Sequence, residues 1–216
     1  ALDASHPGIR PSPATSQQTT STGCSYLDKI MGHMGLPLGN SLLVEEQSTT
    51  EFSSVLCKLF ASQGVLNNRA DSTSGNTHLI VLSSNQHFGK ELPGLYKGSR
   101  KDIKKTKIEE EQSKVTVQNL SEQSNPTRYK DLKIAWRYKL GDENDGSSDS
   151  NRAVLDNEKK NYNNQFDITT RLVPAPTSSE LSFISPIQPP QTVLVQLEQA
   201  IKRHERKLIR IVIPSL

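Results

Sequence analysis

The residues whose spacing could do chemistry lie at positions 46–53, between an apolar stretch and an amphipathic helix pattern. The spacing matches the phosphate-binding P-loop motif G-x-x-x-x-G-K-[ST], in which a glycine-rich turn joins a strand to a helix. The positions are occupied by Glu46, Gln47, Ser48, Thr49, Thr50, Glu51, Phe52 and Ser53. Glutamates stand at both glycine positions and Phe52 stands at the lysine position, so only Ser53 matches the motif.

These differences remove the chemistry of an ordinary nucleotide site. A P-loop binds phosphate because its glycines let backbone N–H groups face the anion while the lysine reaches the terminal phosphates. A carboxylate ~4 Å from a phosphate charge repels it by about 4 kcal/mol at an effective dielectric constant of ~20. We therefore expect a degenerate P-loop that does not bind nucleotide in the ordinary way. The alternative is a plain strand-to-helix turn unrelated to nucleotide sites.

Two further candidate sites are cationic. Basic side chains that could contact RNA phosphates are Lys97, Arg100, Lys101, Lys104 and Lys105. Such contacts would make RNA affinity depend on salt, but a solvated loop balanced by the glutamates at 109–111 is the simpler interpretation. Arg171 is a candidate interface residue, either an arginine finger for a neighbour's site or a surface ion-pair residue. The histidines and cysteines lack metal-site or triad spacing, so no catalytic residue and no metal ligand is assigned.

Alternating strand and helix patterns predict the framework that positions these residues. Apolar strand patterns cover 41–45, 77–83 and 208–213, and helix patterns cover 25–34, 52–64 and a segment that starts at 191. Gly64 is expected to end the second of these helices. A further helix is expected from about Pro126, and 166–172 is expected to be a short ordered segment. Strands that alternate with helices indicate the α/β class, with a mostly parallel sheet flanked by helices.

Composition limits the size of this domain. Of the 216 residues, 33% are hydrophobic and the net charge is +3, which fits one domain with long solvated segments. We expect an extended N-terminal arm over 1–22 and a domain over 23–216 that is truncated at its C-terminal side, with flexible insertions near 67–76 and 141–164. The two cysteines favour free thiols in a reducing compartment. No run of 18 apolar residues is present, so no membrane partner is expected.

Several stretches resemble a known family. They are 8–16, 32–41, 44–52, 90–100, 129–136 and 166–172. The pattern of Thr22-Gly23, Leu27-Asp28 and Gly35-Leu36-Pro37-Leu38-Gly39 is similar to the entry segment of RecA/KaiC-type ATPase domains. Within that superfamily the chain resembles the N-terminal half of fungal members of the family of Elongator complex fourth subunits. The resemblance covers nearly the whole chain.

The resemblance implies a RecA-like fold in which 208–213 is the strand that an aspartate follows in active members, where it holds the Mg²⁺ shell. Pro214 and Ser215 follow the strand here. A second nucleotide-binding signature is therefore degenerate. Together the two losses favour a subunit without conventional ATPase activity.

The resemblance also implies an assembly. The expected partners are two related RecA-like Elongator subunits in a hetero-hexameric ring, the remaining Elongator subunits, and tRNA whose wobble uridines are modified. The expected location is the cytoplasm and also the nucleus. No cofactor is assigned, although ATP at a subunit interface stays open. Two alternatives to a non-catalytic subunit remain, an atypical ATPase that uses such an interface site and a protein-interaction scaffold without nucleic-acid contact.

Overall fold

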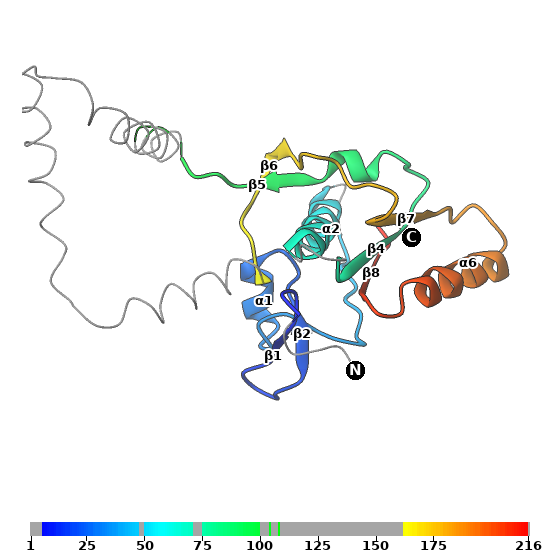
Figure 1. Ribbon diagram of the computed structural model, residues 1–216, viewed down its shortest axis with the longest axis horizontal. Helices are drawn as coiled ribbons and strands as arrows, with labels where there is room; N and C mark the ends of the chain where they lie inside the picture. Colours follow the sequence, from blue (N-terminus) through cyan, green and yellow to red (C-terminus); the bar gives the residue numbers. More distant parts are fainter. Residues whose placement is uncertain are drawn as a thin grey trace, which may run out of the picture. The chain divides into compact units, whose positions relative to one another are not determined.

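The computed structural model describes residues 6–47, 50–70, 75–99, 104, 108 and 162–215. The chain divides into two compact units, residues 1–96 with 155–216 and residues 97–154. The elements of the first unit, shown in Figure 1, are β1 (Arg10–Pro11), β2 (Gln18–Thr20), α1 (Ser25–Ile30), β3 (Leu36–Pro37), α2 (Phe52–Ala70), β4 (Thr77–Leu82), the 3-10 helix η1 (Phe88–Glu91), β5 (Pro93–Leu95), β6 (Phe166–Arg171), β7 (Leu181–Ile184), α6 (Pro190–Arg203) and β8 (Leu208–Val212). The helix predicted from Pro126 lies outside the described residues.

A parallel sheet in the order β7-β4-β8 forms the centre of this unit. Leu79 of β4 lies opposite Leu181 of β7 on one side and Arg210 of β8 on the other. Because successive strand residues point to opposite faces, Leu79 packs against α2 on one face, while His78 lies on the other face, against His204 at the end of α6. The predicted α/β class with a parallel sheet is confirmed.

The core lies between α2 and this sheet. Its buried apolar residues are Ala61, Val65, Leu79, Val81, Phe88, Leu92, Leu172, Leu181 and Val212. The helix contributes Cys57, Ala61 and Val65, which recur every four residues and so share one helix face. Full burial of each large aliphatic side chain contributes about 1.5–3 kcal/mol, so this one cluster fixes how α2 lies on the sheet.

One predicted element and one predicted boundary are wrong. Residues 41–45 form no strand, and Leu42 and Leu43 are 44% and 68% exposed. A strand needs a partner edge for its backbone hydrogen bonds, and this segment pairs with none of the described strands. The helix predicted to end at Gly64 continues to Ala70. Glycine stands at position 64 because Arg210 packs beside it: a Cβ at Gly64 would lie 2.7 Å from Arg210 Cδ.

Strand β7 was not predicted at all. Its apolar run Leu181–Ile184 is short and lies between proline-rich stretches, which are typical of a loop. Parallel pairing with β4 supplies the backbone hydrogen bonds that make it a strand. The predicted strands at 77–83 and 208–213 and the helices at 25–34 and from 191 are confirmed, with ends shifted by a few residues.

Strands β1, β2 and β3 form a small antiparallel sheet that Arg210 ties to the core. The Arg210 guanidinium is 1% exposed, and it donates hydrogen bonds to Ser21 O at 2.9 Å, to Phe60 O at 3.1 Å and to Thr20 Oγ1 at 2.6 Å. It also lies 4.4 Å from the centre of the Phe60 ring. Burial lowers the pKa of Arg210 to about 10, so the group stays charged at neutral pH. Residues 10–20, which composition assigns to an arm, therefore lie against the rest of the unit.

A buried carboxylate completes this junction. Asp28 of α1 is 1% exposed and accepts hydrogen bonds from Ser21 Oγ at 2.6 Å, from the N–H and hydroxyl of Thr22 at 2.8 and 2.6 Å, and from Asn163 Nδ2 at 2.8 Å. Tyr162 donates from its hydroxyl to Met34 O at 3.0 Å. Residues 162 and 163 are thus held where the chain returns to this unit.

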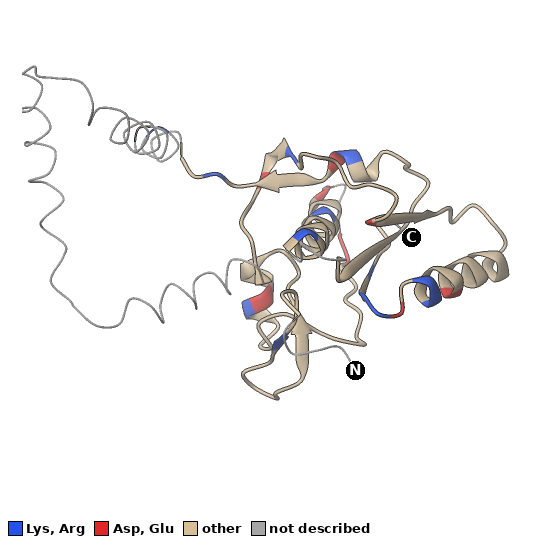
Figure 2. Cartoon of the chain, in the orientation of Figure 1, with Lys and Arg blue, Asp and Glu red and all other residues tan. Residues whose placement is uncertain are grey.

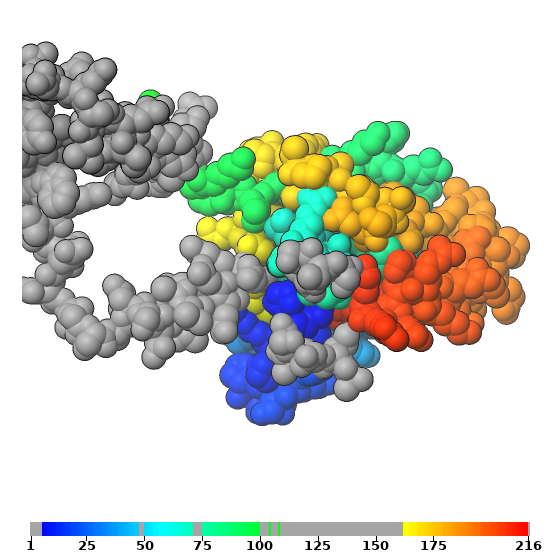
Figure 3. All heavy atoms as spheres, viewed as in Figure 1, coloured from blue at the N-terminus to red at the C-terminus, as the bar shows by residue number. Residues whose placement is uncertain are grey.

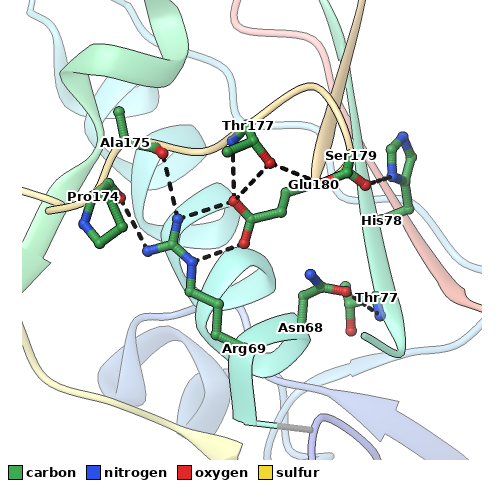
Figure 4. Close-up of polar contacts among 9 residues, drawn as sticks. All are labelled: Asn68, Arg69, Thr77, His78, Pro174, Ala175, Thr177, Ser179 and Glu180. Carbon is green, nitrogen blue, oxygen red and sulfur yellow. Dashed lines mark hydrogen bonds and ion pairs between the residues drawn. The ribbon is translucent and has the colours of Figure 1, made fainter. Parts of the chain in front are cut away.

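The C-terminal end of α2 is fixed to the starts of β4 and β7 (Figure 4). Arg69 binds Glu180 in a two-point ion pair, with Nε–Oε1 at 2.7 Å and Nη2–Oε2 at 3.0 Å. Arg69 Nη1 also donates to Pro174 O at 3.0 Å, and Asn68 Oδ1 accepts the N–H of Thr77 at 3.2 Å. These bonds place the C-terminus of α2 at the edge of the sheet where the strands begin.

A stacked histidine pair joins the sheet to the end of α6. The rings of His78 and His204 lie 3.6 Å apart at an interplanar angle of 16°. His78 is fully buried, and its ring nitrogens lie 3.2 Å from Ser179 O and 2.8 Å from Ser182 Oγ. Burial lowers the pKa of His78 to about 4, and positive charge at His204, Lys207 and Arg203 acts in the same direction.

The lowered pKa of His78 predicts that the stability of the protein depends on pH. Because His78 titrates near 6.5 when unfolded and near 4 when folded, the unfolded state binds more protons between these values. Stability should therefore rise with pH across pH 4–6.5, by up to about 1.4 kcal/mol per pH unit from this group. His78→Gln should flatten the slope measured by urea unfolding, while His87→Gln at an exposed position should not. An unchanged slope in His78→Gln would contradict the prediction.

Candidate functional site at the N-terminus of helix α2

The first turn of α2 lies toward the edge of the sheet where the parallel strands end. The helix has 19 residues and is about 28 Å long at 1.5 Å per residue. Because its C-terminus is bonded to the starts of β4 and β7, its N-terminus points toward the opposite, carboxyl edge. Open α/β sheets bind their ligands at this edge, and the segment 46–53 leads into α2 there.

Glu46 caps this helix end. Its Oε1 accepts the backbone N–H of Ser53 at 2.7 Å and the hydroxyl of Thr50 at 3.0 Å. Its Oε2 accepts the hydroxyl of Ser53 at 3.0 Å. These bonds, first of all that from the Ser53 N–H, hold the pKa of Glu46 below its usual value, and the backbone of Phe52 acts in the same direction. The carboxylate is therefore charged at neutral pH.

A carboxylate in this position does what a bound phosphate would do. The first N–H groups of a helix have no partner within the helix, and the helix dipole makes this end attractive to anions. Phosphates bind helix N-termini through the same groups. Glu46 supplies the anion from the chain itself, so an incoming phosphate would have to displace a bonded carboxylate and then lie beside its charge.

The other positions of the motif lack groups that would favour phosphate. Ser53, the one residue that matches the motif, donates its hydroxyl to Glu46. Phe52, at the lysine position, is 62% exposed and carries no charge. Gln47, Thr50 and Glu51 are exposed, and Ser48 and Thr49 lie outside the described residues. The structure thus brings Glu46, Thr50 and Ser53 together as a closed cap.

The end of β8 carries no carboxylate. Val212 is buried and Ile213 is 44% exposed, and Pro214 and Ser215 follow. Among the residues that the structure describes, no three His, Cys, Asp or Glu residues lie where they could hold a metal ion. In that same part of the chain, no helix is both long enough and apolar enough to cross a bilayer.

The cationic candidates are only partly described. Lys97 and Lys104 are exposed, whereas Arg100, Lys101 and Lys105 lie outside the described residues. Arg171, at the end of β6, donates from Nη1 to Glu91 O at 2.8 Å. The carboxylate of Glu91 is itself paired with Lys58 at 2.9 Å. In this unit Arg171 therefore links β6 to η1, and its predicted part in an interface stays a prediction.

Sequence reasoning missed three residues that shape this unit. Glu46 was interpreted only as a replacement for a P-loop glycine. Its role as a cap was missed because a cap by a residue seven positions before Ser53 has no common sequence signature. Asp28 was seen only as part of a family pattern. Arg210 left a signal that could have been used: Leu208, Arg210 and Val212 alternate in β8, and all three are buried.

The cap predicts a pH-dependent loss of stability in Glu46→Gln. A carboxyl whose pKa is lowered on folding stabilises above its unfolded pKa, near 4.5, and this stabilisation disappears as the pH falls through the folded pKa. The variant should unfold at lower urea concentration than wild type at pH 7, and the gap should close below pH 4.5. Glu45→Gln, at an exposed neighbouring position, should show no such gap. A constant gap at all pH values would contradict the charged cap.

The fold and this helix end define a class: an α/β domain in which the helix end that could bind an anion is capped by a carboxylate of the chain itself. The chain belongs to the PAXNEB protein family, whose family model matches residues 2–216. The resemblance noted from the sequence is confirmed, because the chain is similar to proteins named Elongator complex protein 4.

Three of these relatives show the extent of the similarity. The chain is 66% identical over 224 residues to Elongator complex protein 4 of Saccharomyces cerevisiae, with 100% of this chain and 49% of the relative covered. For the Mus musculus protein the identity is 34%, with 62% and 27% covered. For the Schizosaccharomyces pombe protein it is 27%, with 77% and 40% covered. The chain thus spans about half the length of the Saccharomyces relative and less of the others.

Proposed function

We propose that this chain is part of a non-catalytic, RecA-like subunit of the Elongator complex. In that role it joins two related subunits in a hetero-hexameric ring that binds tRNA and supports wobble-uridine modification. The observation that carries the non-catalytic part is the Glu46 carboxylate bonded to the Ser53 N–H at 2.7 Å. Similarity to proteins named Elongator complex protein 4 supports the assembly.

The RecA-like assignment is supported by the order of the elements. Helix α2 precedes β4 and helix α6 precedes β8, and the two strands pair in parallel, with β4 in the middle of the described sheet. The predicted degenerate P-loop at 46–53 leads into the first helix of this pattern, with no strand directly before it among the described residues. A cytoplasmic and nuclear location follows from the same proposal, and fluorescence microscopy of the tagged full-length protein tests it.

An ATPase would need groups that the described residues do not supply at this helix end. Phosphoryl transfer requires cations and a metal ion around the terminal phosphates. Here the helix end faces the negative charge of Glu46, Phe52 replaces the lysine and Pro214 follows β8. Any ATP turnover in the assembly would therefore come from residues outside this cap.

The test uses the full-length protein produced together with the two related subunits. Size-exclusion chromatography with light scattering should give a hexamer of three kinds of subunit, and filter binding should show tRNA bound in a salt-dependent way. Ser53→Ala should leave any ATP turnover of the assembly unchanged. A monomer that ignores the other subunits would refute the assembly, and a large fall in turnover in Ser53→Ala would refute the non-catalytic role.

A further inference from the structure

The turn between α6 and β8 concentrates positive charge. Residues 202–207, which we call the cationic turn, hold four basic residues and one acidic residue, Glu205. The basic residues are Lys202, Arg203, Arg206 and Lys207. Lys202, Arg203 and Arg206 are exposed, Lys207 is partly exposed, and the ion pairs found among the described residues involve none of them. Figure 2 shows this charge at the C-terminal end of α6 and along the turn.

The backbone of the cationic turn is held at several points. The N–H of His204 donates to Ile201 O at 3.1 Å and the N–H of Lys207 donates to His204 O at 2.8 Å. The N–H of Leu208 donates to Asn76 O at 2.8 Å, and the His204 ring stacks on buried His78. The turn therefore presents its cations from a fixed backbone, which lowers the entropy lost when a ligand binds.

The helix dipole explains the position of only some of these basic residues. Lys202 and Arg203 lie in the last turn of α6, where cations are favoured by the helix dipole. Arg206 and Lys207 lie beyond the helix end, where the dipole effect falls off. Burial lowers the pKa of His204, and Lys207 and Arg203 lower it further, as expected where positive charges gather. An anionic ligand would relieve this repulsion.

We propose that the cationic turn is a contact surface for RNA phosphates. This inference rests on the proposed function, which names tRNA as the ligand, and it assigns phosphate contacts to 202–207 in addition to, or in place of, the candidates at 97–105. Arginine matches phosphate with paired N–H donors, and lysine adds a point charge. In the space-filling view the segment that ends α6 and enters the turn lies on the surface (Figure 3). Such contacts position RNA without reading its sequence.

The test measures the salt dependence of tRNA binding by the full-length protein in its assembled ring. The double variant Arg206→Gln/Lys207→Gln removes two charges from the cationic turn, and the matched control Lys29→Gln/Lys90→Gln removes two exposed charges that belong to no candidate site. Each lost phosphate contact lowers the slope of log affinity against log salt by about 0.7–0.9. The turn variant should lower the slope by about 1.4–1.8 and weaken binding at low salt, while its melting curve overlays that of wild type.

Every outcome decides the proposal. A lower slope in the turn variant that exceeds the effect of the control supports it. Wild-type tRNA binding with an unchanged slope in the turn variant overturns it and leaves the proposed function intact, whether or not the control variant weakens binding. Loss of partner subunits with an unchanged slope would assign the turn to an acidic protein surface and also overturn it. Failure of the wild-type ring to bind tRNA would refute both this inference and the RNA part of the proposed function.

Discussion

Replacing Arg210 with methionine is expected to lower the free energy of unfolding by about 3–5 kcal/mol. The guanidinium donates three hydrogen bonds, to Ser21 O, Phe60 O and Thr20 Oγ1, and bonds that involve a charged group contribute about 1.5–3 kcal/mol each. Methionine fills part of the volume but removes all three of these buried hydrogen bonds. It also leaves the buried carboxylate of Asp28 without the nearby positive charge, which resembles breaking a buried ion pair.

Urea unfolding of wild type and variant measures this effect. Arg206→Met is the matched control, because Arg206 is exposed in the turn before β8 and exposed substitutions usually change stability by less than about 0.5 kcal/mol. A loss below about 1 kcal/mol in Arg210→Met would show that the junction between the N-terminal strands and the sheet does not depend on this side chain. The substitution removes the hydrogen bond between Arg210 and Thr20 of β2. Limited proteolysis should therefore also cleave residues 10–20 faster in the variant.

Gly23→Ala is expected to destabilise the protein by about 3 kcal/mol or more. Gly23 has φ +81°, and a Cβ there would lie 2.4 Å from the backbone oxygen of Leu59 in α2. The left-handed conformation alone costs an alanine about 1–2 kcal/mol. The collision adds to this cost, because backbone of a packed helix cannot move aside as a flexible side chain can. The variant should push α1 and the Asp28 junction away from α2.

Gly39→Ala separates these two causes. Gly39 has nearly the same φ, +78°, but a Cβ there would meet no atom within 4 Å. Its alanine variant should therefore lose only the conformational part, about 1–2 kcal/mol. Thermal unfolding of the two variants side by side tests the difference. Equal losses would contradict the close approach of Gly23 to α2.

The sequence was sufficient for those elements whose patterns are local. The apolar runs at 77–83 and 208–213 predicted two strands of a parallel sheet, and the helical pattern at 52–64 predicted most of α2. Each of these patterns arises from the burial of a short segment. Such burial can be recognised from the apolar residues at neighbouring positions of the sequence.

Features that depend on distant partners could not be predicted. Gly64 predicts a helix end, but the glycine is there because Arg210, 146 positions later, occupies the space beside it. The apolar stretch at 41–45 reads as a strand, but a strand forms only where another strand offers its edge, and none of the described strands does so. Glu46 reads as a defect of the P-loop, whereas its bonds to Thr50 and Ser53 depend on the path of the turn between them.

The degenerate P-loop stays a prediction, because residues 41–45, which were expected to lead into it as a strand, form no strand. The sequence predicted that phosphate-binding groups are missing, which describes a loss. The structure adds that the remaining donors, the N–H and hydroxyl of Ser53, are bonded to Glu46. These two donors at the helix end are thus bonded without a ligand, so this turn does not need a nucleotide to hold its shape.

The occupied helix end is tested most directly by hydrogen–deuterium exchange of residues 50–56 in the full-length protein, with and without saturating Mg²⁺ and ATP. If Glu46 holds the N-terminus of α2, nucleotide leaves exchange over these amides unchanged, whereas Glu46→Ala speeds it even without nucleotide. Saturable protection of the same amides by ATP in the wild-type protein would contradict the account, because it would show that a phosphate takes the place assigned to the carboxylate.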